Sequence, residues 1–274
     1  MQTLKCPVCG NLLHQQDRLL RCPKGHSFDI AKQGYVNLLM SNKSSQKRHG
    51  DDKAMVLARQ AFLDKGYYKP LRTAIIDAAL QHTGQSAHLL DVGCGEGWYT
   101  CGIKEALQSA GKVCEATGID ISREALIQAA KRDKSLTLAV ASVGALPLPD
   151  CSIDLIVNIF APCDDAEFLR VLRPGGVVIR AVPLEDHLMG LKSAVYDTPY
   201  LNSSPVYAPE GFAQADRIEV RYDITLPCQE DIHQLFLMTP YYYKTSRRDQ
   251  QKLETMCELT TNLSFCVFVM KKES

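Results

Sequence analysis

The sequence has no apolar run long enough to cross a lipid bilayer, which argues against a membrane partner. It also has no basic start followed by an apolar stretch, the pattern of a secretory signal. We therefore expect a cytoplasmic protein. A length of 274 residues fits one substantial α/β domain plus a minor module.

The chain also has no net charge, which taken alone argues weakly against a nucleic-acid partner. The charges are distributed unevenly, however. Residues 1–50 hold eight Lys or Arg and two Asp, so this segment has a surplus of six positive charges. Because the whole chain is neutral, the remainder is negative by the same amount. This asymmetry favours an anionic polymer bound at the N-terminal end, although a solvated basic face is the alternative.

Disulfides are not expected, because the 11 cysteines are odd in number and most stand singly in apolar segments. Only the first three form a pattern. Cys6-x-x-Cys9 and Cys22-x-x-x-His26 offer three thiolates and an imidazole, a set that predicts a closed structural zinc site. So small a segment would need a metal to fold. His14 is the less favoured fourth ligand, and chance cysteines near an ordinary turn are the alternative to a metal site.

From residue 87 onward, apolar strand patterns alternate with helical ones. The strands are expected at residues 87–92, 113–119, 136–141, 154–160, 177–182, 217–226 and 264–270. Helices are expected at residues 51–63, 70–80, up to 110, 123–132 and 165–172, after 186, and near 230 and 247. Such alternation predicts an α/β fold with a mostly parallel sheet covered by helices on both faces.

The strongest motif is a glycine-rich turn between a strand and a helix, from residue 89 to residue 98. Gly93, Gly95 and Gly97 allow a tight turn and close approach of the backbone to a ligand. Asp91 lies just before the turn, where a carboxylate can hold an ammonium group, and Asp120 ends the next strand, where it can accept hydrogen bonds from ribose hydroxyls. This order of features predicts an S-adenosylmethionine site; a glycine-rich helix cap without a ligand is the alternative.

The next two strand ends extend the pattern. Ser142 follows a strand, and its hydroxyl is expected to meet the adenine. The turn Leu172-Arg-Pro-Gly-Gly176 follows later, and all these loops should share one rim of the sheet. Together they resemble the class I (Rossmann-like) methyltransferases, which implies a mostly parallel sheet with an antiparallel C-terminal strand.

Nearly the whole chain is similar to the bacterial 23S ribosomal RNA (guanine-N1)-methyltransferase family, and it looks like the Gram-negative type. The segments that carry the likeness are Cys22-Pro-Lys-Gly-His-Ser-Phe-Asp29, Gly34-Tyr-Val-Asn-Leu-Leu39, Arg59-Gln-Ala-Phe-Leu-Asp-Lys-Gly-Tyr-Tyr68, the glycine turn, Ala161-Pro-Cys163 and His187-Leu-Met189. The resemblance implies methylation of N1 of a guanine in a hairpin loop, with S-adenosylmethionine and zinc as cofactors.

The resemblance also implies site residues. It assigns Cys6, Cys9, Cys22 and His26 to zinc, and Tyr68, Gly95, Glu96 and His187 to S-adenosylmethionine. Without the resemblance, we would interpret Tyr68 as a core aromatic residue and His187 as an exposed polar residue at the start of a helix. No catalytic side chain is identified, since methyl transfer needs mainly in-line positioning of donor and acceptor.

We expect three segments: a zinc-binding RNA-recognition domain over residues 1–40, a basic linker over 41–52 and a methyltransferase domain over 53–274. The expected partner is 23S ribosomal RNA, and a homodimer is left open. The sequence leaves two alternative functions open: a small-molecule methyltransferase, and a zinc-dependent RNA-binding protein with a degenerate methyltransferase fold.

Overall fold

The structure is a computed structural model that describes residues 4–40 and 50–273. The basic linker expected at 41–52 therefore lies largely outside the described residues. Within the described part of the chain, no helix combines the length and apolarity that a membrane crossing requires.

The N-terminal segment forms a small three-stranded antiparallel sheet of β1 (His14–Gln16), β2 (Leu19–Arg21) and β3 (Ser27–Asp29). Asp17 adopts a left-handed conformation, with φ of 54°, in the tight turn between β1 and β2. One cysteine-bearing turn precedes β1, and the other joins β2 to β3.

The body is built on an eight-stranded sheet with the order β10-β11-β9-β8-β5-β6-β7-β4. Its strands are β4 (Tyr35–Asn37), β5 (Ser86–Val92), β6 (Val113–Asp120), β7 (Thr137–Val140), β8 (Ile153–Ile159), β9 (Leu172–Pro183), β10 (Phe212–Leu226) and β11 (Leu259–Lys272). The pairs from β4 to β9 are parallel, whereas β11 runs antiparallel to both β9 and β10. The order reverses at β5, which pairs with β6 on one side and β8 on the other, so β5 is the switch point at which such sheets bind ligands.

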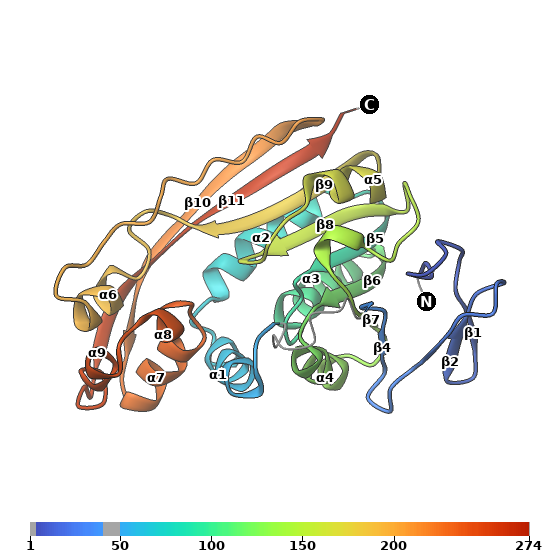
Figure 1. Ribbon diagram of the computed structural model, residues 1–274. Helices are drawn as coiled ribbons and strands as arrows, with labels where there is room; N and C mark the ends of the chain where they lie inside the picture. Colours follow the sequence, from blue (N-terminus) through green and yellow to red (C-terminus); the bar gives the residue numbers. More distant parts are fainter. Residues whose placement is uncertain (1–3, 41–49, 274) are drawn as a thin grey trace.

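Helices cover the sheet and form a lobe beside it (Figure 1). They are α1 (Lys53–Asp64), α2 (Lys69–His82), α3 (Trp98–Ser109), α4 (Arg123–Arg132), α5 (Asp165–Val171), α6 (Met189–Val195), α7 (Gln229–Leu237), α8 (Tyr241–Lys244) and α9 (Arg247–Gln251), with the 3-10 turn η1 at Val143–Ala145. Neighbouring residues of β5 lie in different apolar clusters: Leu89 in one and Leu90 in the other, both fully buried. The central strand is therefore buried on both faces.

This architecture confirms the predicted α/β class I methyltransferase fold with a small N-terminal domain. The final strand pairs antiparallel, as expected, and β10 adds a second antiparallel strand beside it. The strand expected at 177–182 is longer, because β9 starts at Leu172 and includes the Pro-Gly-Gly segment. The short helix α8 was not expected from the sequence.

The N-terminal segment is less separate than the expected boundary at residue 40 implies. Its last strand, β4, pairs in parallel with β7 and forms an edge of the large sheet. Leu4, Leu13 and Leu20 are buried in the same apolar cluster as Leu90 of β5. The segment is too small to bury its own apolar residues, and it completes its core against the larger domain.

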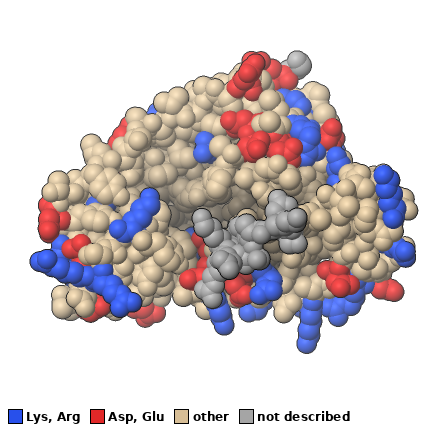
Figure 2. Space-filling model, in the orientation of Figure 1, with Lys and Arg blue, Asp and Glu red and all other residues tan. Residues whose placement is uncertain are grey.

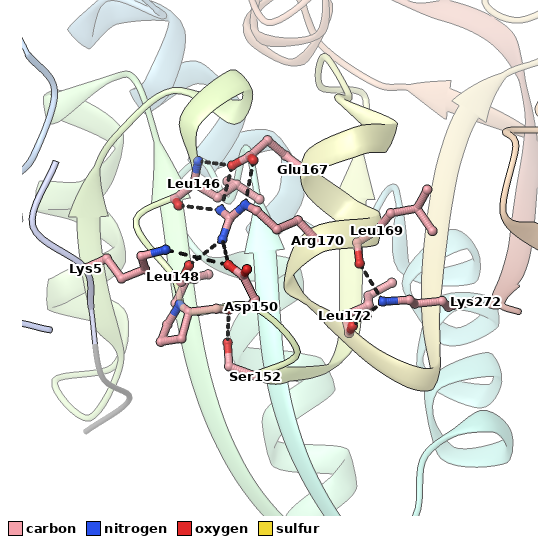
Figure 3. Close-up of polar contacts among 11 residues, drawn as sticks. Lys5, Leu146, Leu148, Asp150, Ser152, Glu167, Leu169, Arg170, Leu172 and Lys272 are labelled. Carbon is pink, nitrogen blue, oxygen red and sulfur yellow. Dashed lines mark hydrogen bonds and ion pairs between the residues drawn. The ribbon is translucent and has the colours of Figure 1, made fainter. Parts of the chain in front are cut away.

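Polar contacts add to this attachment (Figure 3). The Lys5 amide donates to the Pro147 carbonyl at 2.9 Å, and its Nζ lies 3.6 Å from Asp150. Arg170 of α5 also binds Asp150, at 2.7 Å, and pairs with Glu167 at 2.7 Å. The N-terminal segment is thus held against the loop between β7 and β8.

Candidate cofactor site and metal centre

The four residues predicted to bind zinc converge. The Sγ atoms of Cys6, Cys9 and Cys22 and a ring nitrogen of His26 all lie within 4.8 Å of one another. The Cys9 and Cys22 sulfurs are 3.6 Å apart, and Nδ1 of His26 lies 3.3 Å from the Cys22 sulfur. Tetrahedral ligands placed about 2.3 Å from zinc are separated by about 3.8 Å, so these spacings fit a zinc ion.

Two tight turns bring these ligands together. The Gly10 amide donates to the Cys6 carbonyl at 2.8 Å, and the Gly25 amide donates to the Cys22 carbonyl at 2.9 Å. Both glycines have a positive φ, which favours residues without a side chain. His14 lies on β1 outside this cluster.

Hydrogen bonds favour the thiolate form of Cys9, whereas burial raises the pKa of Cys6. Asn11 donates a side-chain hydrogen bond to the Cys9 sulfur at 3.3 Å. Hydrogen bonds from the backbone and side chain of Asn11 lower the pKa of Cys9 to about 6. A thiolate is the form that binds zinc, so this cluster fits a structural zinc ion, and a closed set of four protein ligands leaves no position for a substrate.

The glycine turn lies at the carboxyl end of β5. A Cβ on Gly93 would lie 2.4 Å from the Ala161 Cβ, so a side chain there would displace the loop after β8. A Cβ on Gly95 would meet nothing within 4 Å. The backbone at Gly95 therefore borders open space, as a ligand cradle requires.

Asp120 ends β6 and organises this turn. One carboxylate oxygen accepts a hydrogen bond from the Gly95 amide at 2.9 Å, and the other accepts one from the Ser122 amide at 2.7 Å. Burial raises the pKa of Asp120. The sequence predicted a ribose-binding role for this carboxylate, which stays a prediction; the structure shows that the carboxylate holds the glycine loop in place.

Two further carboxylates are buried around the loop. Asp91 accepts a hydrogen bond from the Thr100 hydroxyl at 2.5 Å, and burial raises its pKa to about 7. Burial also raises the pKa of Glu96, although Arg132 and Arg59 oppose the rise. Oε1 of Glu96 is buried without a hydrogen-bond partner among the described residues.

Two buried acids, Asp91 and Glu96, and the half-buried Asp120 thus surround a backbone turn that borders open space. Buried carboxylates are unfavourable unless positive charge or hydrogen-bond donors compensate them. S-adenosylmethionine supplies a sulfonium, an ammonium and hydroxyl donors. The residues present therefore fit this cofactor.

Tyr68 and His187 are brought together by a third aromatic residue. The Phe265 ring on β11 lies 5.1 Å from the Tyr68 ring and 4.6 Å from the His187 ring, centroid to centroid. Nδ1 of His187 accepts a hydrogen bond from the Ser264 amide at 3.2 Å, and burial lowers the pKa of His187 to about 3. His187 is therefore neutral at pH 7, with Nε2 as its donor, and it is buried rather than exposed.

Ser142 lies half-buried after β7, one strand beyond Asp120. Its Oγ accepts a hydrogen bond from the Gly144 amide at 3.3 Å and caps η1. Among the residues that the structure describes, the Ser142 hydroxyl has no hydrogen-bond acceptor for its proton.

Sequence reasoning missed two residues at the end of β8. Asn158 is fully buried, and its amide donates to the carbonyls of Val92 and Pro162, each at 3.0 Å. It joins the end of β5 to the loop after β8. A lone amide in an apolar strand was the signal that could have revealed it. Phe160, two residues later, carries an exposed ring, which no sequence pattern indicated.

Comparison with known proteins agrees with this geometry. Residues 4–47 match the family described as "RlmA, N-terminal", a zinc ribbon, and residues 89–176 match a methyltransferase domain. The chain is 38% identical, over 70% of its length and 67% of the other, to a Streptomyces fradiae protein named 23S rRNA (guanine(748)-N(1))-methyltransferase. It is 34% identical to the Bacillus subtilis protein YxjB, provisionally named a 23S rRNA (guanine-N(1)-)-methyltransferase, over 92% of this chain and 91% of that one. The chain belongs to the 23S rRNA (guanine-N1)-methyltransferase family.

A solved structure supports the fold alone. The YcgJ protein of Bacillus subtilis superposes with a TM-score of 0.50 at 15% identity, covering 76% of this chain and all of that one. In this member of the guanine-N1 methyltransferase family, the zinc ligands lie in the segment that matches the zinc ribbon, and the glycine loop lies in the segment that matches the methyltransferase domain.

Proposed function

We propose that this protein transfers a methyl group from S-adenosylmethionine to N1 of a guanine in a hairpin loop of 23S ribosomal RNA. The proposal rests on one observation above all: a glycine loop surrounded by buried and half-buried acids is joined in one chain to a zinc ribbon with exposed cations. A small-molecule methyltransferase would need only the first part.

We propose that the site residues act as the sequence predicts. Asp91 and Glu96 would face the positively charged end of the cofactor, Asp120 the ribose and Ser142 the adenine. Tyr68 and His187 would close the site from the side of β11. The cofactor supplies an already activated methyl group, so the protein's task is to align it with guanine N1 and exclude water.

RNA recognition is proposed for the zinc-binding segment. Four exposed cations lie on it, and none has an ion pair among the residues described: Arg18, Arg21, Lys24 and Lys32. An open hollow of about 350 Å³ on this segment is lined by His14, Gln16 and Arg21, which offer polar groups to an RNA backbone. Figure 2 shows a hollow at the centre of the molecule, between this segment and the lobe of α7–α9.

The lobe of α7–α9 also carries exposed cations (Figure 2). Lys244 of α8 and Arg247 and Arg248 of α9 are exposed, next to the exposed ring of Tyr243. Cations interleaved with aromatic residues suit single-stranded RNA. We propose a cytoplasmic location, because a ribosomal RNA substrate supports it. Two predictions remain: that the protein belongs to the Gram-negative type of the family, and that it forms a homodimer.

The test is nucleoside mass spectrometry of 23S ribosomal RNA from a strain that lacks the gene. N1-methylguanosine should disappear and should return with the wild-type gene but not with an Asp120→Ala variant. Because an N1 methyl group blocks base pairing, a reverse-transcription stop identifies the guanine. An unchanged nucleoside profile would favour a small-molecule substrate, and failure of the purified protein to bind S-adenosylmethionine would favour an RNA-binding protein with a degenerate fold.

A further inference from the structure

Phe160 is an unusual aromatic residue at the rim of the sheet. It directly follows β8 and adopts a left-handed backbone conformation, with φ of 54°, although it is not a glycine. Its side chain is 45% exposed, whereas the rings of Tyr68 and Phe265 that it packs against are 3% and 0% exposed. A strained backbone that holds an apolar ring in solvent suggests a function for that ring.

The position of Phe160 is fixed on two sides. Its amide donates to the Ala181 carbonyl of β9 at 3.1 Å. Its ring lies 5.5 Å from the Phe265 ring and 6.3 Å from the Tyr68 ring, centroid to centroid. The next residue, Ala161, abuts Gly93 of the cofactor loop. The Phe160 ring therefore packs against the buried aromatic cluster, and the residue after it contacts the glycine loop.

The order of the strands separates Phe160 from the expected adenine position. Ser142 follows β7, which lies beyond β6 on one side of β5, whereas Phe160 follows β8 on the other side. A cofactor whose ribose lies at Asp120 and whose adenine lies at Ser142 extends away from Phe160. The exposed ring thus borders the end of the site from which the methyl acceptor must approach.

We propose that the Phe160 ring is the surface on which the target guanine stacks after it leaves its own base stack. The inference rests on the proposed function, because it requires an RNA base as the methyl acceptor. An enzyme that modifies a base must take it out of the stack, and aromatic side chains then receive it. Stacking also explains why the ring needs an exposed face and no polar partner.

The experiment compares Phe160→Ala, Phe160→Leu and Phe160→Tyr with the wild type, using a synthetic RNA hairpin of the 23S target loop. Removal of the aromatic face in the alanine and leucine variants should lower kcat/KM by about fivefold to 150-fold, the range expected for loss of one base–aromatic stack. The tyrosine variant should retain the wild-type rate. The leucine variant keeps an apolar side chain, so it tests stacking even if the alanine variant does not fold.

Affinity for S-adenosylmethionine, measured by calorimetry, should be unchanged in all three variants. A matched control is Tyr200→Ala, which removes another half-exposed ring, 46% exposed and packed on Tyr196, and should not change the rate. Full activity of Phe160→Leu would overturn the inference, as would an equal loss of cofactor affinity, which would make Phe160 a cofactor contact. If wild-type protein does not methylate the hairpin or intact 23S ribosomal RNA, the proposed function itself fails.

Discussion

Lys5 and Asp150 form an ion pair across the contact between the zinc ribbon and the methyltransferase domain, with Nζ 3.6 Å from Oδ1. Arg170 approaches the same carboxylate from α5, at 2.7 Å. Two cations from different parts of the chain thus share one acid (Figure 3). The zinc ribbon is docked on the larger domain, so changes in it can alter stability as well as RNA recognition.

The two cations at Asp150 should differ in their effect on stability. Lys5→Ala should lower the free energy of unfolding by less than about 1 kcal/mol, because Asp150 is 64% exposed and such surface pairs contribute little. Arg170→Ala should cost more, since Arg170 also donates to the carbonyls of Leu146 and Leu148. Urea denaturation of both variants provides the comparison, and equal decreases in stability would contradict it.

RNA binding by the zinc ribbon is testable without disturbing its docking. Replacing Arg18, Arg21, Lys24 and Lys32 with alanine should weaken RNA binding and flatten its dependence on salt. The log–log slope should fall by about 0.7 for each RNA phosphate that the variant no longer neutralises. Binding titrations at several salt concentrations measure the slope. The matched control is Lys271→Ala, because Lys271 is an exposed cation at the far end of β11.

A full deletion of the zinc ribbon should end at residue 30 and not at residue 40, because β4 belongs to the large sheet. The shortened protein should bind S-adenosylmethionine but fail to methylate ribosomal RNA. It should also melt at a lower temperature, because the deletion removes Leu4, Leu13 and Leu20 from the apolar cluster that they share with the larger domain. Methylation at the normal rate would show that the ribbon is not the RNA reader.

One zinc ion per chain should be lost in Cys22→Ser, because a hydroxyl replaces a thiolate in a closed site. Elemental analysis measures the metal. Cys163→Ser, at a cysteine outside the cluster, is the control and should keep the ion. Freshly purified wild-type protein without zinc, or a full equivalent in Cys22→Ser, would refute the metal site.

Cofactor binding should release a proton from Asp91. Burial raises its pKa from the ordinary value of 3.8 to about 7, so the folded protein holds this proton to a higher pH than the unfolded chain does. In the absence of cofactor, protonated Asp91 therefore contributes to the stability of the folded protein below about pH 4. This contribution is lost as the pH rises to about 7. A bound ammonium favours the carboxylate and so expels the proton near pH 6.

Calorimetry in buffers of different ionisation enthalpy measures the proton released. Asp91→Asn should release none and should bind S-adenosylmethionine more weakly. Thr100→Val, which removes only the hydrogen-bond donor to Asp91, should retain proton release. A binding enthalpy that does not vary with the buffer in wild-type protein would rule out this role for Asp91.

Asp120→Ala should affect both cofactor and loop. The binding free energy for S-adenosylmethionine should become less favourable by about 1.5 to 3 kcal/mol, the usual loss when a charged hydrogen-bond partner is removed. Stability should fall as well, because the amides of Gly95 and Ser122 lose their acceptor. Asp120→Asn keeps one acceptor and should be less destabilised. Unchanged affinity of Asp120→Ala by calorimetry would count against the cofactor site.

The sequence by itself was sufficient to predict the features that depend on residues close together in the chain. The strand and helix periods predicted most elements, because side-chain burial repeats every two or 3.6 residues. The zinc ligands were predictable since two short turns carry all four, and the glycine loop because Gly93, Gly95 and Gly97 need positive φ. In each case, the physical requirement is met within a few residues of the motif.

Only the tertiary structure decided the features that depend on strand order and register. No local pattern places β4 beside β7, or Phe265 between Tyr68 and His187, which are far apart in the sequence. The contact by which Asp120 holds the glycine loop was likewise hidden, because its acceptor geometry toward Gly95 exists only when β5 and β6 pair. Phe160 became informative for the same reason: its exposure and its left-handed backbone are properties of the packed sheet rim, where the surrounding contacts hold a strained residue in place.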